Sequence, residues 1–265
     1  MPSLSIFNNH PAVVGMVHLK PLPGSPGWSG SIDDILQSAL QDAHALEDGG
    51  ADGIMVENFW DVPFTKGQVE AVTVAAMTRC AAEIRGEVNI PIGVNVLRND
   101  GPSALSIAQV IGARFIRVNV LSSAMVTDQG IIQGCAYDVS RLRARLHSDV
   151  AIMADIMVKH AYPFGSMDIV SVARDTALRS GADVLIVSGS ETGAPLEIED
   201  LEKVKKSLPD FPLASGSGVT VENVLQFLPS LDMLIIGTWF KRDGDVRNPV
   251  DPKRVAEMVN RVRRG

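Results

Sequence analysis

Short runs of apolar residues alternate with longer amphipathic stretches along the whole chain. Eight of the runs have the length of a strand and are almost continuously hydrophobic, which is typical of parallel strands covered by helices. They occupy residues 13–17, 53–57, 92–96, 115–119, 150–155, 184–188, 211–215 and 233–237. The stretches between them carry apolar residues at helical spacing, so the pattern predicts a series of β–α units.

Helix start signals support this pattern. Ser31 and Asp34 form a capping box ahead of an apolar stripe that Gly49 and Gly50 end. Asp251 followed by proline is a further N-cap. The remaining helices are predicted to begin near Gly67, Pro102, Asp138, Ser166, Glu197 and Thr220.

Eight β–α units in 265 residues fit an α/β protein with a (β/α)8 barrel, and we expect residues 1–265 to form a single domain. An open doubly wound sheet is the competing fold. It would favour a Gly-x-Gly-x-x-Gly turn after the first strand, and residues 17–24 contain no such pattern. The barrel is therefore the predicted fold.

Composition narrows the class of protein further. The chain is 46% apolar and 21% charged, which is ordinary for a globular protein. A net charge of −7 argues against general nucleic-acid binding, and the apolar runs are too short for membrane insertion. Two cysteines and a start without a basic, apolar leader fit a reducing compartment. We therefore expect a soluble, cytoplasmic protein.

Polar residues end almost all of the predicted strands. The active site of a (β/α)8 barrel lies at these carboxyl ends, so the residues should converge on one mouth. They are His18, Glu57, Asn95, Asn119, Asp155, Ser188, Ser215 and Gly237. We interpret Glu57 or Asp155 as a general base and His18 or Lys159 as an acid or electrophile. A purely structural polar layer is the alternative.

Two basic residues near this ring leave alternatives open. Arg117 shares a strand face with Asn119, so it either points inward and pairs with Glu57 or Asp155, or faces a helix. Lys159 follows the fifth predicted strand. It could form a Schiff base or attract a phosphate, while the neighbouring His160 could act as an acid–base group or be structural.

A glycine-rich turn follows the seventh predicted strand. Gly216, Ser217 and Gly218 precede a helix predicted from Val221, and such a turn presents amides and a positive dipole end to an anion. Barrels often bind phosphate with the loops after strands seven and eight. We therefore predict a small phosphorylated ligand, held by this turn together with Gly237 and Thr238, and by Asn95, Asn119, Ser188 and Ser215. Lys241 could add charge or be solvated.

Several loops could complete the site. Residues 58–64 concentrate aromatic side chains that cap the barrel or stack on a ring. Residues 120–135 and 156–165 are long enough for lids or substrate walls. Oxygens of Glu57, Asn95, Asn119 and Asp155 could hold Mg²⁺, a cofactor the sequence allows without requiring it.

Six segments together resemble the BtpA/SgcQ family. They are residues 14–26, 53–64, 91–100, 115–120, 154–160 and 187–189. The resemblance implies a TIM-barrel fold. The family takes its name from a member linked to photosystem I accumulation in cyanobacteria, and another member belongs to a sugar-utilisation gene region.

Three functions remain compatible with these observations. The first is an enzyme of small phosphorylated metabolites such as sugar phosphates, working as an isomerase, epimerase or lyase. The second is a non-catalytic assembly or stability factor of the photosystem I type, as the resemblance implies. The third is a flavin- or nucleotide-binding barrel. The sequence also leaves open whether the chain forms a homo-oligomer.

Overall fold

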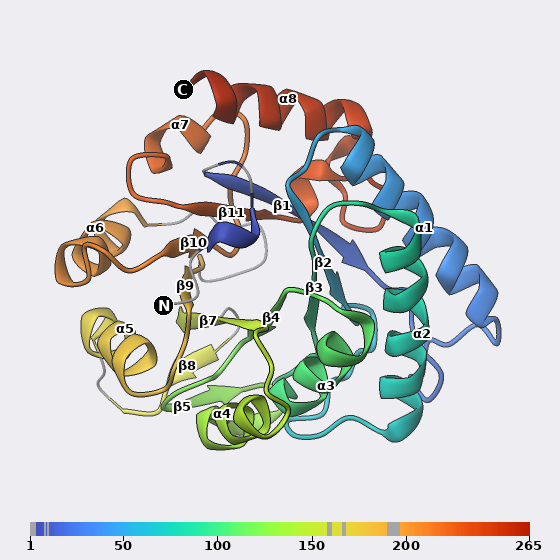
Figure 1. Cartoon of the computed structure of the whole chain (residues 1–265), viewed down its shortest axis with the longest axis horizontal. Helices are drawn as coiled ribbons and strands as arrows, with labels where there is room; N and C mark the ends of the chain where they lie inside the picture. The colour runs from blue at the N-terminus through green and yellow to red at the C-terminus, as the bar shows by residue number, and fades with distance from the viewer. Residues whose placement is uncertain (1–3, 8, 10, 158–160, 166–167, 190–196) are drawn as a thin grey trace.

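The computed structural model describes residues 4–7, 9, 11–157, 161–165, 168–189 and 197–265. Within these residues, eight parallel strands close into one barrel in chain order (Figure 1). The strands are β1 (Ala12–His18), β2 (Gly53–Glu57), β3 (Ile92–Asn95), β4 (Phe115–Val118), β7 (Ala151–Met157), β9 (Val184–Val187), β10 (Leu213–Ser215) and β11 (Met233–Ile236). The predicted (β/α)8 barrel is confirmed, and each strand overlaps its predicted run.

Helices form a ring outside the barrel (Figure 1). They are α1 (Ile32–Asp48), α2 (Ala71–Glu87), α3 (Gly101–Ile111), α4 (Ala136–Arg145), α5 (Ile169–Leu178), α6 (Ile198–Ser207), α7 (Val224–Phe227) and α8 (Pro252–Arg264). Ser31 Oγ accepts the Asp34 amide at the start of α1, as the capping box predicts. Among the described residues, no helix combines the length and the hydrophobicity needed to span a bilayer.

The two-residue period of each strand separates an outer from an inner core. Alternate side chains such as Val13 and Val17 pack against the helices, while Val14 and Met16 fill the barrel. The next inward position at the carboxyl end of most strands is polar, as His18 on β1 shows. The barrel therefore has an apolar floor below a polar upper layer.

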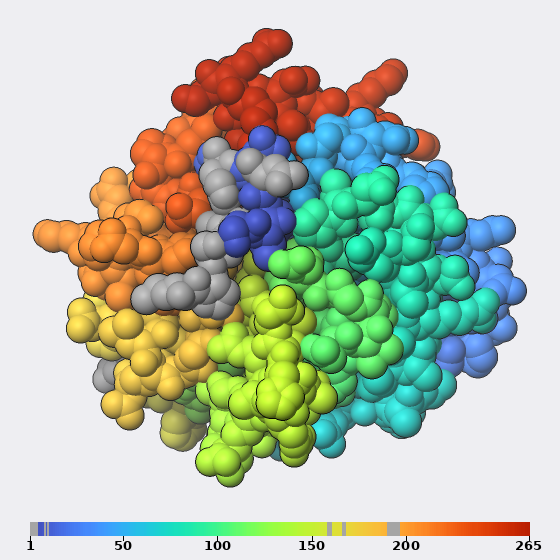
Figure 2. Space-filling view, viewed as in Figure 1, coloured from blue at the N-terminus to red at the C-terminus, as the bar shows by residue number. Residues whose placement is uncertain are grey.

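The opposite, amino end of the barrel is closed by the beginning of the chain. The short 3₁₀ helix η1 (Leu4–Ile6) leads to Phe7, whose ring lies 5.6 Å from the Phe115 ring inside the barrel. Figure 2 shows this segment in dark blue over the middle of that face.

A small sheet lies beside the barrel where the sequence predicts loops. Strands β5 (Ala124–Thr127), β6 (Gly130–Gln133) and β8 (Ala161–Pro163) pair antiparallel in the order β6-β5-β8. The side chains of Met125 and Ile132 are buried beneath it against Val120. The predicted loops 120–135 and 156–165 thus pair with each other, a contact between distant segments that local patterns do not reveal.

Candidate functional site

A cavity of about 530 Å³ opens at the carboxyl ends of the barrel strands. Its polar side chains come from β1, β2, β4 and the loops after β3, β10 and β11. They are His18, Glu57, Arg98, Arg117, Asn119, Ser217, Thr220 and Thr238. Aromatic residues of the loop after β2 form one wall, namely Phe59, Trp60 and Phe64. The cavity therefore lies where the ring of polar strand ends predicts it.

His18 and Glu57 are cross-strand neighbours on β1 and β2. His18 Nε2 lies 3.6 Å from Glu57 Oε2, and both side chains are more than nine-tenths buried. The Phe59 ring stacks on the imidazole at 4.3 Å, which fixes the plane of His18. A buried carboxylate next to an imidazole is an arrangement that can exchange a proton with a ligand in the cavity.

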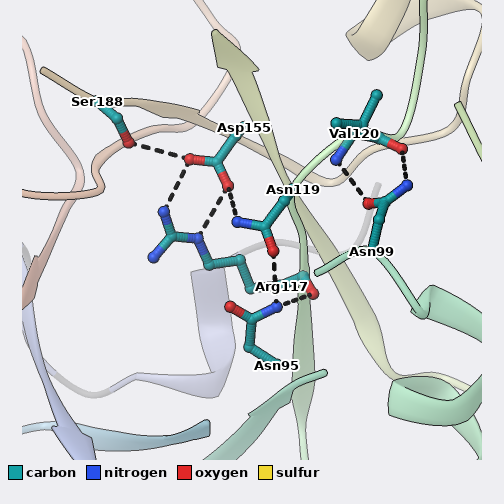
Figure 3. Close-up of polar contacts among 7 residues, drawn as sticks. All are labelled: Asn95, Asn99, Arg117, Asn119, Val120, Asp155 and Ser188. Carbon is teal, nitrogen blue, oxygen red and sulfur yellow. Dashed lines mark hydrogen bonds and ion pairs between the residues drawn. The ribbon is translucent and has the colours of Figure 1, made fainter. Parts of the chain in front are cut away.

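A hydrogen-bonded network surrounds Asp155 inside the barrel (Figure 3). Arg117 donates from Nε to Oδ2 at 2.9 Å and from Nη2 to Oδ1 at 2.8 Å. Ser188 Oγ donates to Oδ1 at 3.0 Å, and Asn119 Nδ2 donates to Oδ2 at 3.2 Å. Arg117 therefore points inward and pairs with Asp155, which settles the orientation that the sequence leaves open.

Burial and charge oppose each other at the two arginines of the cavity. Burial lowers the pKa of Arg117, but the charge and hydrogen bonds of Asp155 outweigh it, so that pKa is raised. Burial dominates at Arg98, whose pKa is lowered despite the charge of Asp155, with Arg117 adding like-charge repulsion. Two buried guanidinium groups thus share the floor of the cavity.

Three predicted site residues lie behind the cavity wall. The carboxylate of Asp155 is shielded by its donors, and Asn95 donates to Asn119 Oδ1 and to the Arg117 carbonyl, both at 3.1 Å. Ser188 lies against Asp155. None of the three lines the cavity formed by the described residues. This geometry favours positioning roles for them and leaves Glu57 as the accessible carboxylate.

Ser215 points away from the site. Ala214 on the same strand packs in the barrel interior, while Leu213 packs with the outer core. The strand period therefore directs Ser215 toward the helices, where its Oγ is buried without a hydrogen-bond partner among the described residues. A strand-end position alone does not decide the face of its side chain.

Gly216 has a different role from the predicted one. Its amide donates to the Val187 carbonyl at 2.8 Å, so it is not available to an anion. A Cβ atom at Gly216 would lie 2.2 Å from Ser188 Oγ and 3.0 Å from Arg117 Nη2. Glycine is required here because the Asp155 network occupies the space of a side chain.

The helix predicted from Val221 is shorter and starts later. α7 covers only Val224–Phe227, because Asn223 binds the loop before it: Asn223 Oδ1 accepts the Thr220 amide and Nδ2 donates to the Gly218 carbonyl. The helix-dipole argument for the anion site is therefore wrong. What remains is the loop itself.

Ser217 and Gly218 keep the features of an anion site. Ser217 is 9% exposed and lines the cavity, and its Oγ has no hydrogen-bond partner within the described residues. No acceptor in that part of the chain binds the amides of residues 217–219. Gly218 has a φ of 72°, which favours glycine. Gly237 and Thr238 line the cavity beside this loop, as predicted.

Lys241 does not reach the cavity. Its ammonium group is buried against Asp42 of α1, and Asp42 also accepts the Val250 amide. The residue that could have added charge to a phosphate instead joins the chain after β11 to the first helix. Its position in the sequence, shortly after a predicted strand, gives no sign of this partner.

The predicted Mg²⁺ ligands do not fit a cation. Asp155 is already neutralised by Arg117, and the Asn119 amide donates to it, while Asn95 lies behind the cavity wall. Among the described residues, no cluster of three or more His, Cys, Asp or Glu could hold a metal ion. Lys159, His160 and most of the loop after β9 lie outside the described residues.

The sequence analysis missed two polar residues after β3. Arg98 is 8% exposed and lines the cavity. Asn99 accepts the Val120 amide and donates to its carbonyl, at 2.7 and 2.9 Å, which ties the loop after β4 to the start of α3 (Figure 3). The available signal is a polar run that begins just beyond the predicted end of the strand.

Both cysteines are expected to be unreactive. Burial raises the pKa of Cys80 and of Cys135 to about 11, so at pH 8 only about one thiol in a thousand is a thiolate. We expect iodoacetamide to label the folded protein at least tenfold more slowly than the chain unfolded in urea. Equal labelling rates, followed by mass spectrometry, would contradict this burial.

The fold and the site define the class as a TIM-barrel protein with a polar cavity at the carboxyl end of its strands. Similar solved structures include KGPDC from Streptococcus mutans, which has also been solved in complex with a phosphosugar, and N-(5'-phosphoribosyl)anthranilate isomerase from Pyrococcus furiosus. Each has a TM-score of 0.60 and 14% identity. The KGPDC match covers 97% of this chain and 99% of its own, and the isomerase match 96% and 99%. This likeness concerns the fold alone.

Sequence similarity identifies the family. The model of the BtpA family matches residues 9–264, so the chain belongs to the BtpA family. The photosystem I biogenesis protein BtpA of a Synechocystis strain is 43% identical over 100% of this chain and 92% of its own length. A Thermococcus kodakarensis protein is 47% identical over 93% of both chains.

Proposed function

We propose that this chain is an enzyme that binds a small phosphorylated metabolite in the barrel cavity and moves a proton on it, as an isomerase, epimerase or lyase. One observation carries the proposal: a loop with open amides and an unpartnered buried hydroxyl within the described residues shares a cavity with the His18–Glu57 pair. A structural polar layer would satisfy its buried groups internally.

The phosphate end of the ligand belongs at residues 217–219 and 238. Backbone amides and the Ser217 hydroxyl donate hydrogen bonds without carrying charge, which suits a phosphate dianion next to the acidic remainder of the chain. Gly237 joins this subsite to the acid–base pair, because a Cβ on it would lie 3.4 Å from His18 Cε1. A ligand held here by its phosphate therefore extends toward His18 and Glu57.

Proton transfer belongs to Glu57 and His18. Both are buried, both line the cavity, and their distance of 3.6 Å lets one side chain orient the other. In this role Glu57 takes a proton from a carbon of the ligand, and the imidazole returns one to an oxygen or carbon. Asp155 positions Arg117 rather than contacting the ligand.

Replacing Ser217 with alanine tests the phosphate subsite. We expect glycerol 3-phosphate to bind about tenfold more weakly, because one hydrogen bond to a charged group is lost. Ser215→Ala is the matched control, since that hydroxyl is also buried and unpartnered in the described structure but faces the helices. Calorimetric titration measures both. Equal affinity in the two variants would place the phosphate elsewhere.

A second candidate is an assembly factor, the function named in the cyanobacterial relative. The observation that favours it is an apolar row across the small sheet, in which Ile131, Val126 and Tyr162 are cross-strand neighbours and are 45%, 40% and 78% exposed. Under this function, Val126→Lys would abolish the biological activity and Glu57→Gln would leave it intact. The opposite pattern supports the enzyme.

A further inference from the structure

The guanidinium group of Arg117 offers two edges for planar partners. Nε and Nη2 form one edge, and both donate to Asp155. Nη1 and the second hydrogen of Nη2 form the other edge. Within the described structure Nη1 has no hydrogen-bond partner, and Figure 3 shows it turned away from Asp155.

This open edge belongs to a buried side chain that lines the cavity. Arg117 is 5% exposed, so bulk water does not replace the missing partner at low cost. A Cβ on Gly216 would lie 3.0 Å from Nη2, which places the guanidinium beside the loop that contains Ser217. The open edge is thus a fixed donor pair close to the phosphate subsite.

The surroundings hold Arg117 in one orientation. Ser188 and Asn119 each donate to Asp155, and Asn95 donates to both Asn119 and the Arg117 carbonyl. This network costs buried polar groups that a barrel interior does not need for stability. It is the arrangement expected when a cation must be presented to a ligand at a defined angle.

The charges on the cavity floor favour an anion. Asp155 balances one of the two guanidinium groups, while Arg98 adds a second positive charge that also lines the cavity. Glu57, the remaining carboxylate, lies beside His18. An additional carboxylate on the ligand would complete the balance and match the two parallel N–H groups of Arg117.

We propose that the ligand carries a carboxylate in addition to its phosphate, and that Arg117 binds the carboxylate through Nη1 and Nη2. The inference rests on the proposed function for the phosphate end of the ligand. It narrows the substrate class from phosphorylated metabolites to phosphorylated acids. The carboxylate then lies across the cavity from Ser217, between Arg117 and Arg98.

Two matched probes test the inference. Glycerol 3-phosphate and 3-phosphoglycerate differ only by a hydroxymethyl group in place of a carboxylate. We expect calorimetry to show 3-phosphoglycerate binding at least tenfold more tightly, and its methyl ester binding like glycerol 3-phosphate. In Arg117→Lys, which keeps a cation for Asp155, the carboxylate advantage should disappear while glycerol 3-phosphate binds as before.

The outcomes separate the two proposals. Equal binding of 3-phosphoglycerate and glycerol 3-phosphate to the unmodified protein overturns the carboxylate site and leaves the phosphate site standing. Failure of every phosphorylated probe overturns the proposed function, and glycerate then tests the carboxylate site alone. If Arg117→Lys does not fold, the methyl ester decides the question in the unmodified protein.

Discussion

Replacing Asp155 with alanine is expected to lower the free energy of unfolding by about 3–5 kcal/mol. The variant leaves the Arg117 guanidinium in the barrel without the carboxylate that holds its charge, and removes the acceptor for Ser188 and Asn119. Urea unfolding followed by circular dichroism measures the change. The effect is large because neither water nor another carboxylate among the contacts of Arg117 replaces the lost partner.

The controls separate loss of a buried pair from loss of any ion pair. Asp33→Ala removes an exposed pair with Arg79, whose side chains are 77% and 49% exposed, and should cost less than about 1 kcal/mol. Combining Asp155→Leu with Arg117→Met should recover most of the stability, since no buried charge remains. A loss below about 1 kcal/mol for Asp155→Ala would show that Arg117 finds another partner.

Replacing Glu57 with glutamine is expected to reduce turnover by about 10²–10⁴-fold with little change in stability. Glutamine keeps the shape of the side chain but cannot accept a proton from carbon. Deuterium incorporation from D₂O into a mixture of phosphorylated metabolites, followed by mass spectrometry, detects the reaction before the substrate is known. The unmodified protein should label at least one component, and Glu57→Gln should not.

Glu83→Gln provides the control, because Glu83 is exposed on α2. It should label the same component at the unmodified rate. If Glu57→Gln also keeps that rate, Glu57 is not the base. If the unmodified protein labels nothing while it still binds phosphate, the cavity serves binding rather than proton transfer.

The positions of the barrel strands were predictable because they depend on local pattern. A strand covered by helices must be apolar on both faces, so runs such as 53–57 and 233–237 are visible without any partner. The inward direction of Glu57, Asn95 and Asp155 follows from the same two-residue period. Ser215 shows its limit, since the strand end predicted for it lies one residue from the inward position.

The loops were harder because their structure depends on contacts between distant segments. The small β6-β5-β8 sheet joins the loop after β4 to the loop after β7, and each of its strands has only three or four residues. α7 is short because Asn223 binds the preceding loop. Neither feature has a periodicity that sequence reasoning can detect.

The sequence by itself determined the barrel, the end at which its cavity opens, and most of the polar residues around it, because period and strand order are local properties. Only the tertiary structure decided which charges meet. Arg117 pairs with Asp155 rather than Glu57, and Lys241 with Asp42, 199 residues away. Charge pairing depends on which side chains the closed barrel brings within a few ångströms, and spacing along the chain does not encode that distance.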